Sequence, residues 1–224
     1  MQNGSERMKN KQKNQRRRSA PLWGMLLFFI LVAIDQLTKL FADVYFTANG
    51  APEKITVVEG WLWLRITYNR GISYGLGANS SPILKILVIA ATAVMMAGLL
   101  VLFFKLDNNR RPIKTALVFV VAGGVGNLID RVYYRVWDTA TKPFGVRDMV
   151  DLSKFGFAVC NFADFFITAG AVMLVLSLLF FDKDAAFPLG KYKKLAKDAE
   201  EAEEAEAAGA VETKRKAERE ETNG

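Results

Sequence analysis

The sequence predicts an α-helical membrane protein with four transmembrane helices and a small extracytoplasmic β-sheet between the first and second of them. Three observations predict this fold class. Four stretches of the 224-residue chain are apolar and long enough to cross a bilayer of ~30 Å, which takes roughly 20 helical residues. Most Lys and Arg residues lie beside those stretches, and only Lys39, Lys85 and Lys114 lie within them. A segment rich in β-branched and aromatic residues separates the first two.

The four predicted spans cover residues 22–42, 83–104, 113–130 and 162–181. The second and fourth are almost free of polar residues, whereas the first and third carry polar residues in their final turns. The basic stretch before residue 22 is also typical of a cleaved signal peptide. The first span continues through Asp35 and Lys39 without an A-x-A cleavage site, which favours an uncleaved helix.

The distribution of Lys and Arg predicts the orientation. Residues 1–20 hold seven Lys/Arg and one acid, and the loop 105–114 and the start of the C-terminal tail are also basic. By the positive-inside rule, both termini are cytoplasmic, and residues 43–81 and 131–160 face outward. We therefore expect a basic cytoplasmic arm (1–20), a membrane domain (21–182) with an outer β-rich insert at about 43–81, and a charged Ala/Glu/Lys tail (183–224) that is disordered or partly helical.

The outer segment between the first two spans reads KITVVEGWLWLRITYNRGISYG, and its composition predicts short strands with a turn at Glu59-Gly60. Trp61, Trp63 and Tyr68 are typical of a surface at the lipid headgroup level. Two interpretations remain open from the sequence. The segment is either an ordinary β-rich loop or a small sheet that lies on the membrane and shapes a binding cleft.

The chain contains no histidine and a single cysteine, Cys160. This composition excludes Ser-His-Asp and Cys-His mechanisms, Cys/His zinc sites and intrachain disulfides. The GISYG pattern at 71–75 matches a nucleophile elbow, but without a histidine its triad cannot be completed. We expect no metal and no cofactor, and catalysis would have to rest on carboxylates, Lys, Tyr or Ser. The isoelectric point near 9.5 reflects membrane topology, so we expect no nucleic-acid partner.

The predicted topology brings four carboxylates, those of Asp35, Asp130, Asp151 and Asp164, to the outer leaflet level. Asp35 can pair with Lys39 at i+4, and Asp130 with Arg131 can brace a helix end. Asp151 and Asp164 have weaker local partners. Two neighbouring carboxylates in a partly dry site separate their pKa values, so that one activates water and the other polarises a peptide carbonyl. That is the aspartic-protease arrangement. A small proton-coupled transporter could use the same acids as a proton relay, and the chemistry leaves both functions open.

Four ordered blocks carry a family resemblance: DQLTK (35–39), NRGISYG (69–75), GGVGNLIDR (123–131) and VDLSKFGFAVCNFAD (150–164). Over residues 20–182 the chain resembles the bacterial lipoprotein signal peptidases (signal peptidase II), membrane aspartic proteases with four spans. The resemblance implies an endopeptidase of the bacterial inner membrane, with its active site at the outer leaflet level. It would remove signal peptides from diacylglyceryl-modified prolipoproteins by cleaving N-terminal to the lipidated cysteine. It also implies contacts with membrane lipids, inhibition by globomycin-type compounds and a monomeric protein.

The resemblance also implies the site residues. The catalytic pair would be Asp151 and Asp164. The residues that would bind substrate or support the site are Asp35, Lys39, Asn69, Gly71, Asn127, Asp130, Arg131 and Asn161. The chain departs from the family pattern at Tyr74 and Cys160, where Phe is common, and in the short spacer between Asp151 and Asp164. The glycines at 123–126 are expected to let the third span approach its neighbours closely.

Overall fold

The computed structural model describes residues 22–71, 80–138, 145–182, 184–190, 192–198, 200–201 and 209. The chain divides into two compact units, one that ends at Met173 and one that begins at Leu174, and each is described by itself. The arm predicted for residues 1–20 and most of the predicted tail (183–224) lie outside the described residues.

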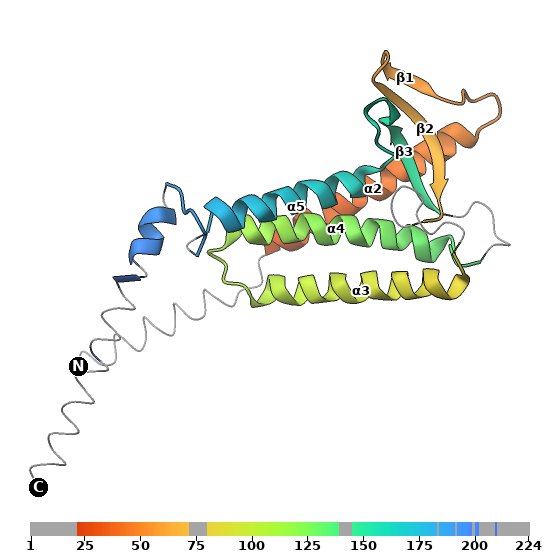
Figure 1. Cartoon of the computed structure of the whole chain (residues 1–224). Coiled ribbons are helices and arrows are strands. Elements are labelled where there is room, and N and C mark those ends of the chain that lie inside the picture. The colour runs from red at the N-terminus through yellow and green to blue at the C-terminus, as the bar shows by residue number, and fades with distance from the viewer. Residues whose placement is uncertain are drawn as a thin grey trace, which may run out of the picture. The chain divides into compact units, whose positions relative to one another are not determined.

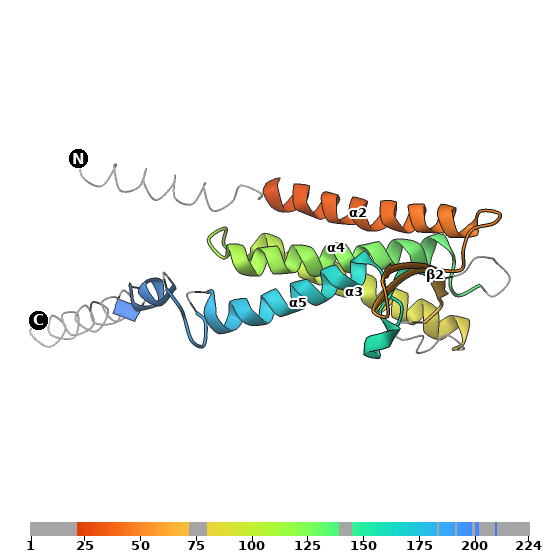
Figure 2. The ribbon, with the colours of Figure 1, turned by 90° about the horizontal axis from the view of Figure 1, so that it is seen from above.

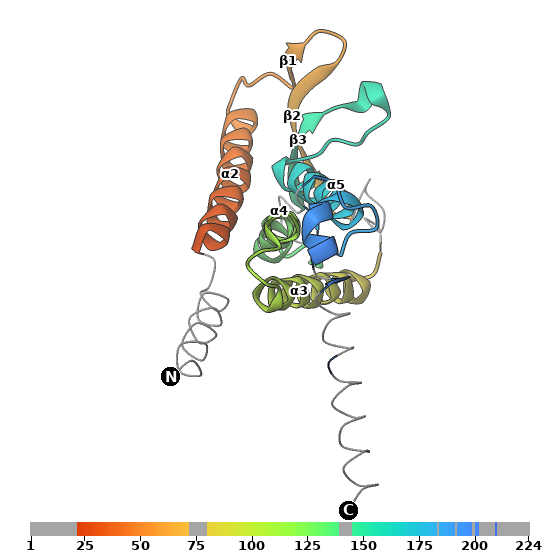
Figure 3. The ribbon, with the colours of Figure 1, turned by 90° about the vertical axis from the view of Figure 1, so that its left-hand side faces the viewer.

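The described residues form four helices that are long and apolar enough to cross a membrane: α2 (Leu22–Thr47), α3 (Pro82–Lys105), α4 (Arg111–Tyr133) and α5 (Phe162–Phe180). All four predicted spans are confirmed. Helix α4 is the most enclosed of them, because 61% of its apolar window is buried, compared with 11–17% for the other three. Figure 2 shows α2 beside α4, and Figure 3 shows α2 and α3 on different sides of α4. The helix with the most polar end is thus also the central one.

Glycines in α4 permit the close approach that the sequence predicts. A Cβ at Gly126 would collide with the carboxylate of Asp35 in α2. A Cβ at Gly123 would collide with the carbonyl oxygen of Ala163 and would lie 2.8 Å from the Ile167 side chain in the first turns of α5. The absence of side chains at these two positions lets α4 contact both neighbouring helices at van der Waals distance.

A three-stranded antiparallel sheet lies at the end of the helices where α2 ends and α5 begins (Figure 1). Strands β1 (Ile55–Val58) and β2 (Leu62–Asn69) come from the segment between α2 and α3, as predicted. Strand β3 (Val146–Asp151) comes from the segment between α4 and α5 and was not predicted. Trp63 pairs with Asp151, and Asn69 with Val146, so β3 runs along the full length of β2.

Strand β3 is buried along its whole length because it is covered on both edges. One edge pairs with β2, and the other forms a bridge between Val150 and Cys160, just before α5. In this bridge the backbone N–H of each residue donates to the carbonyl oxygen of the other, at 2.8 and 2.9 Å. Burial raises the pKa of the Cys160 thiol to about 12. The Cys160 thiol is therefore neutral near pH 7.

The part of the sheet farthest from α4 exposes apolar side chains. The rings of Trp61, in the turn between β1 and β2, and of Phe155, in the 3-10 helix η1 (Ser153–Phe155), lie 5.1 Å apart. Val57, Val58 and Phe157 are also exposed. The predicted strands therefore form a sheet, and its exposed aromatic residues suit the headgroup level of a membrane.

In the second unit, the chain reverses direction after α5. The backbone N–H groups of Phe187 and Leu189 donate to the carbonyl oxygens of Leu179 and Phe180, at 2.8 and 3.0 Å. The ring of Tyr192, at the start of a short helix over 192–198, lies 6.4 Å from that of Phe181.

Candidate active site

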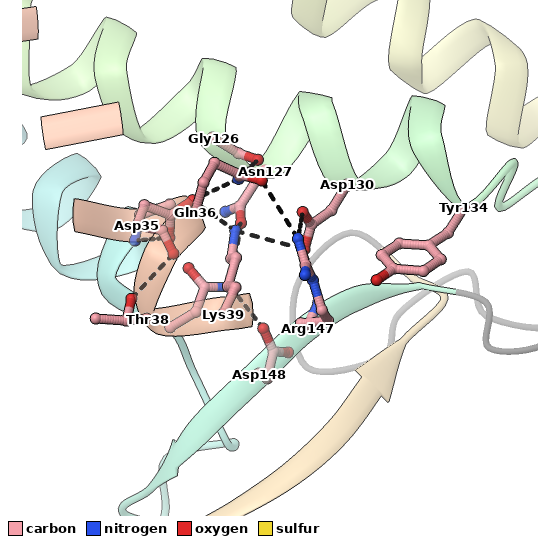
Figure 4. A network of polar contacts seen from close by, with 12 residues as sticks. Asp35, Gln36, Thr38, Lys39, Gly126, Asn127, Asp130, Tyr134, Arg147 and Asp148 are labelled. Atoms are coloured by element: carbon pink, nitrogen blue, oxygen red, sulfur yellow. Dashed lines mark hydrogen bonds and ion pairs between the residues drawn. The ribbon is translucent and has the colours of Figure 1, made fainter. Parts of the chain in front are cut away.

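The polar residues of the first unit converge where the sheet meets α4. Figure 4 shows side chains of α2, α4 and β3 that point toward one another there. Four of the converging residues, Asp35, Lys39, Asp130 and Asn161, are completely buried. Because unpaired charges are costly at membrane depth, the partners of each carboxylate decide what that carboxylate can do.

Asp35 and Lys39 form the ion pair that their i, i+4 spacing predicts, with Lys39 Nζ 2.8 Å from Asp35 Oδ2. The ammonium group also donates to Asn127 Oδ1 at 3.0 Å and lies 3.7 Å from Asp130 Oδ2. The other oxygen of Asp35 accepts from the backbone N–H of Ala163 at 2.9 Å. Asp35 therefore attaches the first turn of α5 to α2.

Asp130 joins α4 to β3. Its carboxylate accepts from the Arg147 backbone N–H at 3.0 Å and from Arg147 Nη2 at 2.8 Å. The same guanidinium donates to Gln36 Oε1 at 3.3 Å and lies over the ring of Tyr134. The sequence indicated Arg131 as the neighbour that braces Asp130, whereas Arg147 holds this carboxylate from 17 residues away. Asp130 and Asp35 both have cationic partners.

Two asparagine side chains connect Asp148 of β3 with Asp164 of α5. Asn161 Nδ2 donates to Asp148 Oδ1 at 2.6 Å and to Asn127 Oδ1 at 3.1 Å. Asn127 Nδ2 in turn donates to Asp164 Oδ1 at 2.8 Å. Asn161 also caps α5, since its Oδ1 accepts from the Asp164 backbone N–H at 3.2 Å, and its own N–H donates to Asp164 Oδ2 at 3.0 Å. This reciprocal cap fixes the direction of the Asp164 carboxylate.

The surroundings of Asp148 favour its protonated form. Burial, followed by the negative charge of Asp164, raises the pKa of Asp148 to about 7, against the hydrogen bonds from Asn161 and Asn69. Asn69 is itself oriented by Gly71, whose backbone N–H donates to Asn69 Oδ1 at 2.9 Å. Arg131 interacts electrostatically with both Asp148 and Asp164. Two carboxylates with such different surroundings can act as an acid and a base.

Asp151, which the sequence favoured as the partner of Asp164, has other contacts in the structure. Asp148 takes this place, because side chains along a strand alternate between faces and Asp151 lies three residues farther along β3. Asp151 Oδ1 accepts from the Ser153 backbone N–H at 3.0 Å, and Oδ2 lies 2.8 Å from Arg65 Nε in an ion pair without hydrogen-bond geometry. Although burial acts in the opposite direction, Ser153 and Arg65 hold the pKa of Asp151 below its usual value.

The other predicted site residues lie in or beside this network. Asp35, Lys39, Asn127, Asp130 and Asn161 belong to the hydrogen-bonded core of the site. Sequence reasoning missed Asp148, Arg147 and Gln36. A period-2 reading of VRDMVD as a strand would have placed Asp148 and Asp151 on opposite faces and raised the question of which one faces α5.

The fold and the site define a class of protein. The chain is a multi-pass membrane protein in which two carboxylates, joined by amides rather than neutralised by a lysine between them, lie at one end of the helices. Such a pair of carboxylates is suited to the acid–base chemistry of an aspartic-type hydrolase.

Comparisons with known proteins agree with this class. Residues 27–180 match the family model of signal peptidase (SPase) II. The chain is 33% identical over 171 residues to the lipoprotein signal peptidase of Bifidobacterium adolescentis, covering 76% of this chain and 82% of that protein. It is 29% identical over 159 residues to the lipoprotein signal peptidase of Fusobacterium nucleatum, covering 71% of this chain and 87% of that protein. A solved bacterial membrane enzyme shares the fold, with a TM-score of 0.59 at 22% identity over 73% of this chain and 91% of that one.

The chain belongs to the signal peptidase II family, a family of proteases. The four helices and the small β-sheet expected from the sequence are confirmed, and the solved bacterial membrane enzyme shares this fold.

Proposed function

We propose that this protein removes signal peptides from diacylglyceryl-modified prolipoproteins by cleaving N-terminal to the lipidated cysteine. The family match and the names of the relatives support the substrate class. The position of the site supports it independently. A substrate anchored by lipid presents its scissile bond near the membrane surface, and the carboxylates lie where the helices meet the sheet.

The catalytic pair in this proposal is Asp148 and Asp164. The amide bridge through Asn161 and Asn127 is the observation that carries it. Asp35 is paired with Lys39, and Asp130 with Arg147, so these carboxylates are occupied in holding helices and strand together. Asp151, which the sequence favoured, is paired with Arg65. Asp148 and Asp164 remain as the carboxylates with amide partners.

The geometry suggests a division of labour within the pair. Both oxygens of Asp164 accept hydrogen bonds from N–H groups, which suits an ionised carboxylate that takes a proton from the attacking water. Asp148, with its pKa raised to about 7, keeps its proton and can donate a hydrogen bond to the scissile carbonyl. As the C–N bond breaks, the proton taken from water passes to the leaving amine, and the pair returns to its starting state.

The remaining site residues have positioning roles in this proposal. Asp35, Lys39 and Asp130 fix α2, α4, α5 and β3 relative to one another, and Asn127 and Asn161 hold the two catalytic carboxylates. Asn69 contacts Asp148 and lies where the substrate backbone would approach. Gly71 and Arg131 lie at the same place, beside Asn69 and the catalytic carboxylates respectively.

We also propose that the sheet faces outward from the bacterial inner membrane and that both termini are cytoplasmic. The Lys/Arg-rich arm and the basic loop 105–114 support this orientation by the positive-inside rule. The transporter alternative receives less support. Toward the opposite end from the sheet, a cavity of about 370 Å³ between α2, α3 and α4 is lined by apolar residues, which offer no path for a proton.

The test is processing of a purified diacylglyceryl-prolipoprotein by the full-length protein in lipid nanodiscs, with the product identified by mass spectrometry. We expect release of the signal peptide with the lipidated cysteine as the new N-terminus, and no release by Asp164→Asn. The same prolipoprotein without its lipid should be a poor substrate. Equal cleavage by Asp164→Asn, or cleavage at another bond, would overturn the proposal.

A further inference from the structure

The chain that follows α5 turns back and is attached to the end of that helix. The last carbonyl groups of a helix have no partners within the helix itself. Three of them, those of Leu178, Leu179 and Phe180, accept hydrogen bonds from the returning backbone. The donors are the N–H groups of Ala186, Phe187 and Leu189, at 3.2, 2.8 and 3.0 Å. The returning segment is therefore held level with the last turn of α5.

That level is the edge of the hydrocarbon layer of a membrane. Helix α5 has 19 residues, which gives it a length of about 29 Å, close to the ~30 Å thickness of the hydrocarbon core of a bilayer. Phe180, its last residue, therefore lies where acyl chains meet lipid headgroups. The side chains that the returning segment exposes are presented to this layer.

The returning segment exposes large apolar side chains. Phe187 is 67% exposed and Leu189 is 53% exposed, and Phe181 and Leu195 are exposed as well. Single exposed apolar residues are common on protein surfaces, whereas several in one short stretch mark a surface that contacts an apolar neighbour. The acyl boundary of the bilayer is such a neighbour, and it lies at the depth where these side chains are held.

The short helix over 192–198 has two different sides. Tyr192 lies toward α5, because its backbone N–H donates to the Leu189 carbonyl oxygen at 3.1 Å and its ring lies 6.4 Å from that of Phe181. Leu195, three residues later, lies on the same side of the helix. The other side carries three exposed ammonium groups, those of Lys193, Lys194 and Lys197. One apolar and one basic side are typical of a helix that lies in a membrane interface.

The charge of the sequence changes sign directly after the last of these lysines. Residues 198–206 hold six acids and no Lys or Arg. A negatively charged surface attracts the three lysines and repels the acidic run. The part of the tail that suits an anionic surface is therefore the part that is attached to α5.

We propose that Phe187, Leu189 and the helix over 192–198 form an anchor that lies in the headgroup layer of a bilayer containing anionic phospholipids. The apolar side chains enter the acyl boundary, and the lysines contact lipid phosphates. In the orientation proposed above this is the cytoplasmic leaflet, although the contact itself does not depend on that orientation. The anchor uses no residue of the candidate active site.

The test places a fluorophore on each side of the short helix in the full-length protein. In a Cys160→Ser background, Leu195→Cys or Lys194→Cys carries one environment-sensitive label. The protein is held as single copies in nanodiscs of phosphatidylcholine, with or without phosphatidylglycerol, whose acyl chains are brominated to quench fluorescence. With phosphatidylglycerol present, we expect the label at position 195 to be quenched and the label at position 194 to remain in water. Without phosphatidylglycerol, quenching at position 195 should decrease.

Removal of charge gives a matched comparison with the label at position 195. The combined changes Lys193→Gln, Lys194→Gln and Lys197→Gln should lower the ratio of quenched to unquenched label about a hundredfold, since each basic residue near an anionic surface contributes about fivefold. The control removes the same number of charges beyond the acidic run, by Lys214→Gln, Arg215→Gln and Lys216→Gln. It should resemble the protein with all its lysines.

Four results would overturn the proposal. They are equal quenching at positions 194 and 195, equal quenching in both lipid mixtures, an equal loss in the control, and protection of position 195 only in discs that hold two copies, which would identify a second copy of the chain as the occupant. Because the label is measured without any substrate, its failure leaves the proposed peptidase function intact, and failure of cleavage leaves the anchor intact.

Discussion

The two faces of strand β3 carry the same residue type in opposite surroundings. On the inner face, Asp148 is 3% exposed and contacts amide groups, and its pKa rises to about 7. On the outer face, Asp151 contacts Ser153 and the half-exposed Arg65, and its pKa falls below the usual value. Burial acts in the same direction on both groups, so the partners decide the outcome. Asp148 is a candidate acid because its hydrogen bonds come from neutral amide groups and not from a cation.

The largest expected effect follows from removing the inner carboxylate. Asp148→Asn should lower kcat for prolipoprotein cleavage by roughly 10²–10⁴-fold, the contribution of a general acid or base. The protein should remain folded, because an amide keeps the shape of the side chain and the native state no longer has to accommodate a charge there. Cleavage assays and thermal unfolding of the same preparations check both parts. A variant that loses activity only because its Tm falls sharply would contradict the assignment.

The next largest effect is expected for substitution of Lys39, the buried lysine at the core of the site. It should lower the thermal stability of the protein. Lys39→Met leaves Asp35 buried without its cation, which costs about 3–5 kcal/mol. Lys54→Met is the matched control, since Lys54 lies 5.2 Å from the ring of Trp63 near the exposed part of the sheet. We expect a large decrease in Tm for the first variant and little change for the second. Equal Tm values would show that the Asp35–Lys39 pair does not stabilise the fold.

The pH dependence separates the two faces further. Asp148 donates a hydrogen bond only while protonated, so kcat/KM should fall as pH rises through about 7. The free energy of unfolding depends on pH in the same direction. The folded protein keeps a proton on Asp148 that the unfolded chain releases above pH ~3.9. Stability from this group therefore decreases between about pH 4 and pH 7. Profiles of kcat/KM measured from pH 5 to 9 check the predicted fall in rate. A profile that stays flat above pH 7 would contradict the role of Asp148.

Much of this fold is predictable because membrane spans depend on local sequence. Apolar runs of sufficient length gave all four helices, with α2 extending five residues past the predicted end at residue 42. The Asp35–Lys39 pair was predictable for the same reason, since one helical turn separates the two residues. The hairpin of β1 and β2 followed from its β-branched and aromatic composition.

The parts that were not predictable depend on contacts between distant segments. Strand β3 is held by β2, some 80 residues earlier, and by Cys160. Its own sequence, VRDMVD, does not alternate strictly between charged and apolar residues, so it carries no clear period-2 strand signal. Arg147 finds Asp130 only because β3 lies against α4. The choice between Asp148 and Asp151 depends on which face of that strand meets α5. The family blocks indicated the region of the site, and within it the contacts of β3 lead us to propose Asp148 in place of Asp151.

The smallest expected effect, and the sharpest comparison with the inner face, is that of Asp151→Asn. Its ion pair with Arg65 involves a side chain that is 42% exposed, and pairs of this kind contribute about 1 kcal/mol or less. The amide retains an oxygen that can accept the hydrogen bond from the Ser153 backbone N–H. We expect cleavage within about twofold of the wild type and nearly the same Tm, measured beside Asp148→Asn, since the two substitutions differ only in the face of β3 that they alter. If Asp151→Asn lost activity while Asp148→Asn kept it, the catalytic pair would be Asp151 and Asp164, and β3 would have to present its other face to α5 during catalysis.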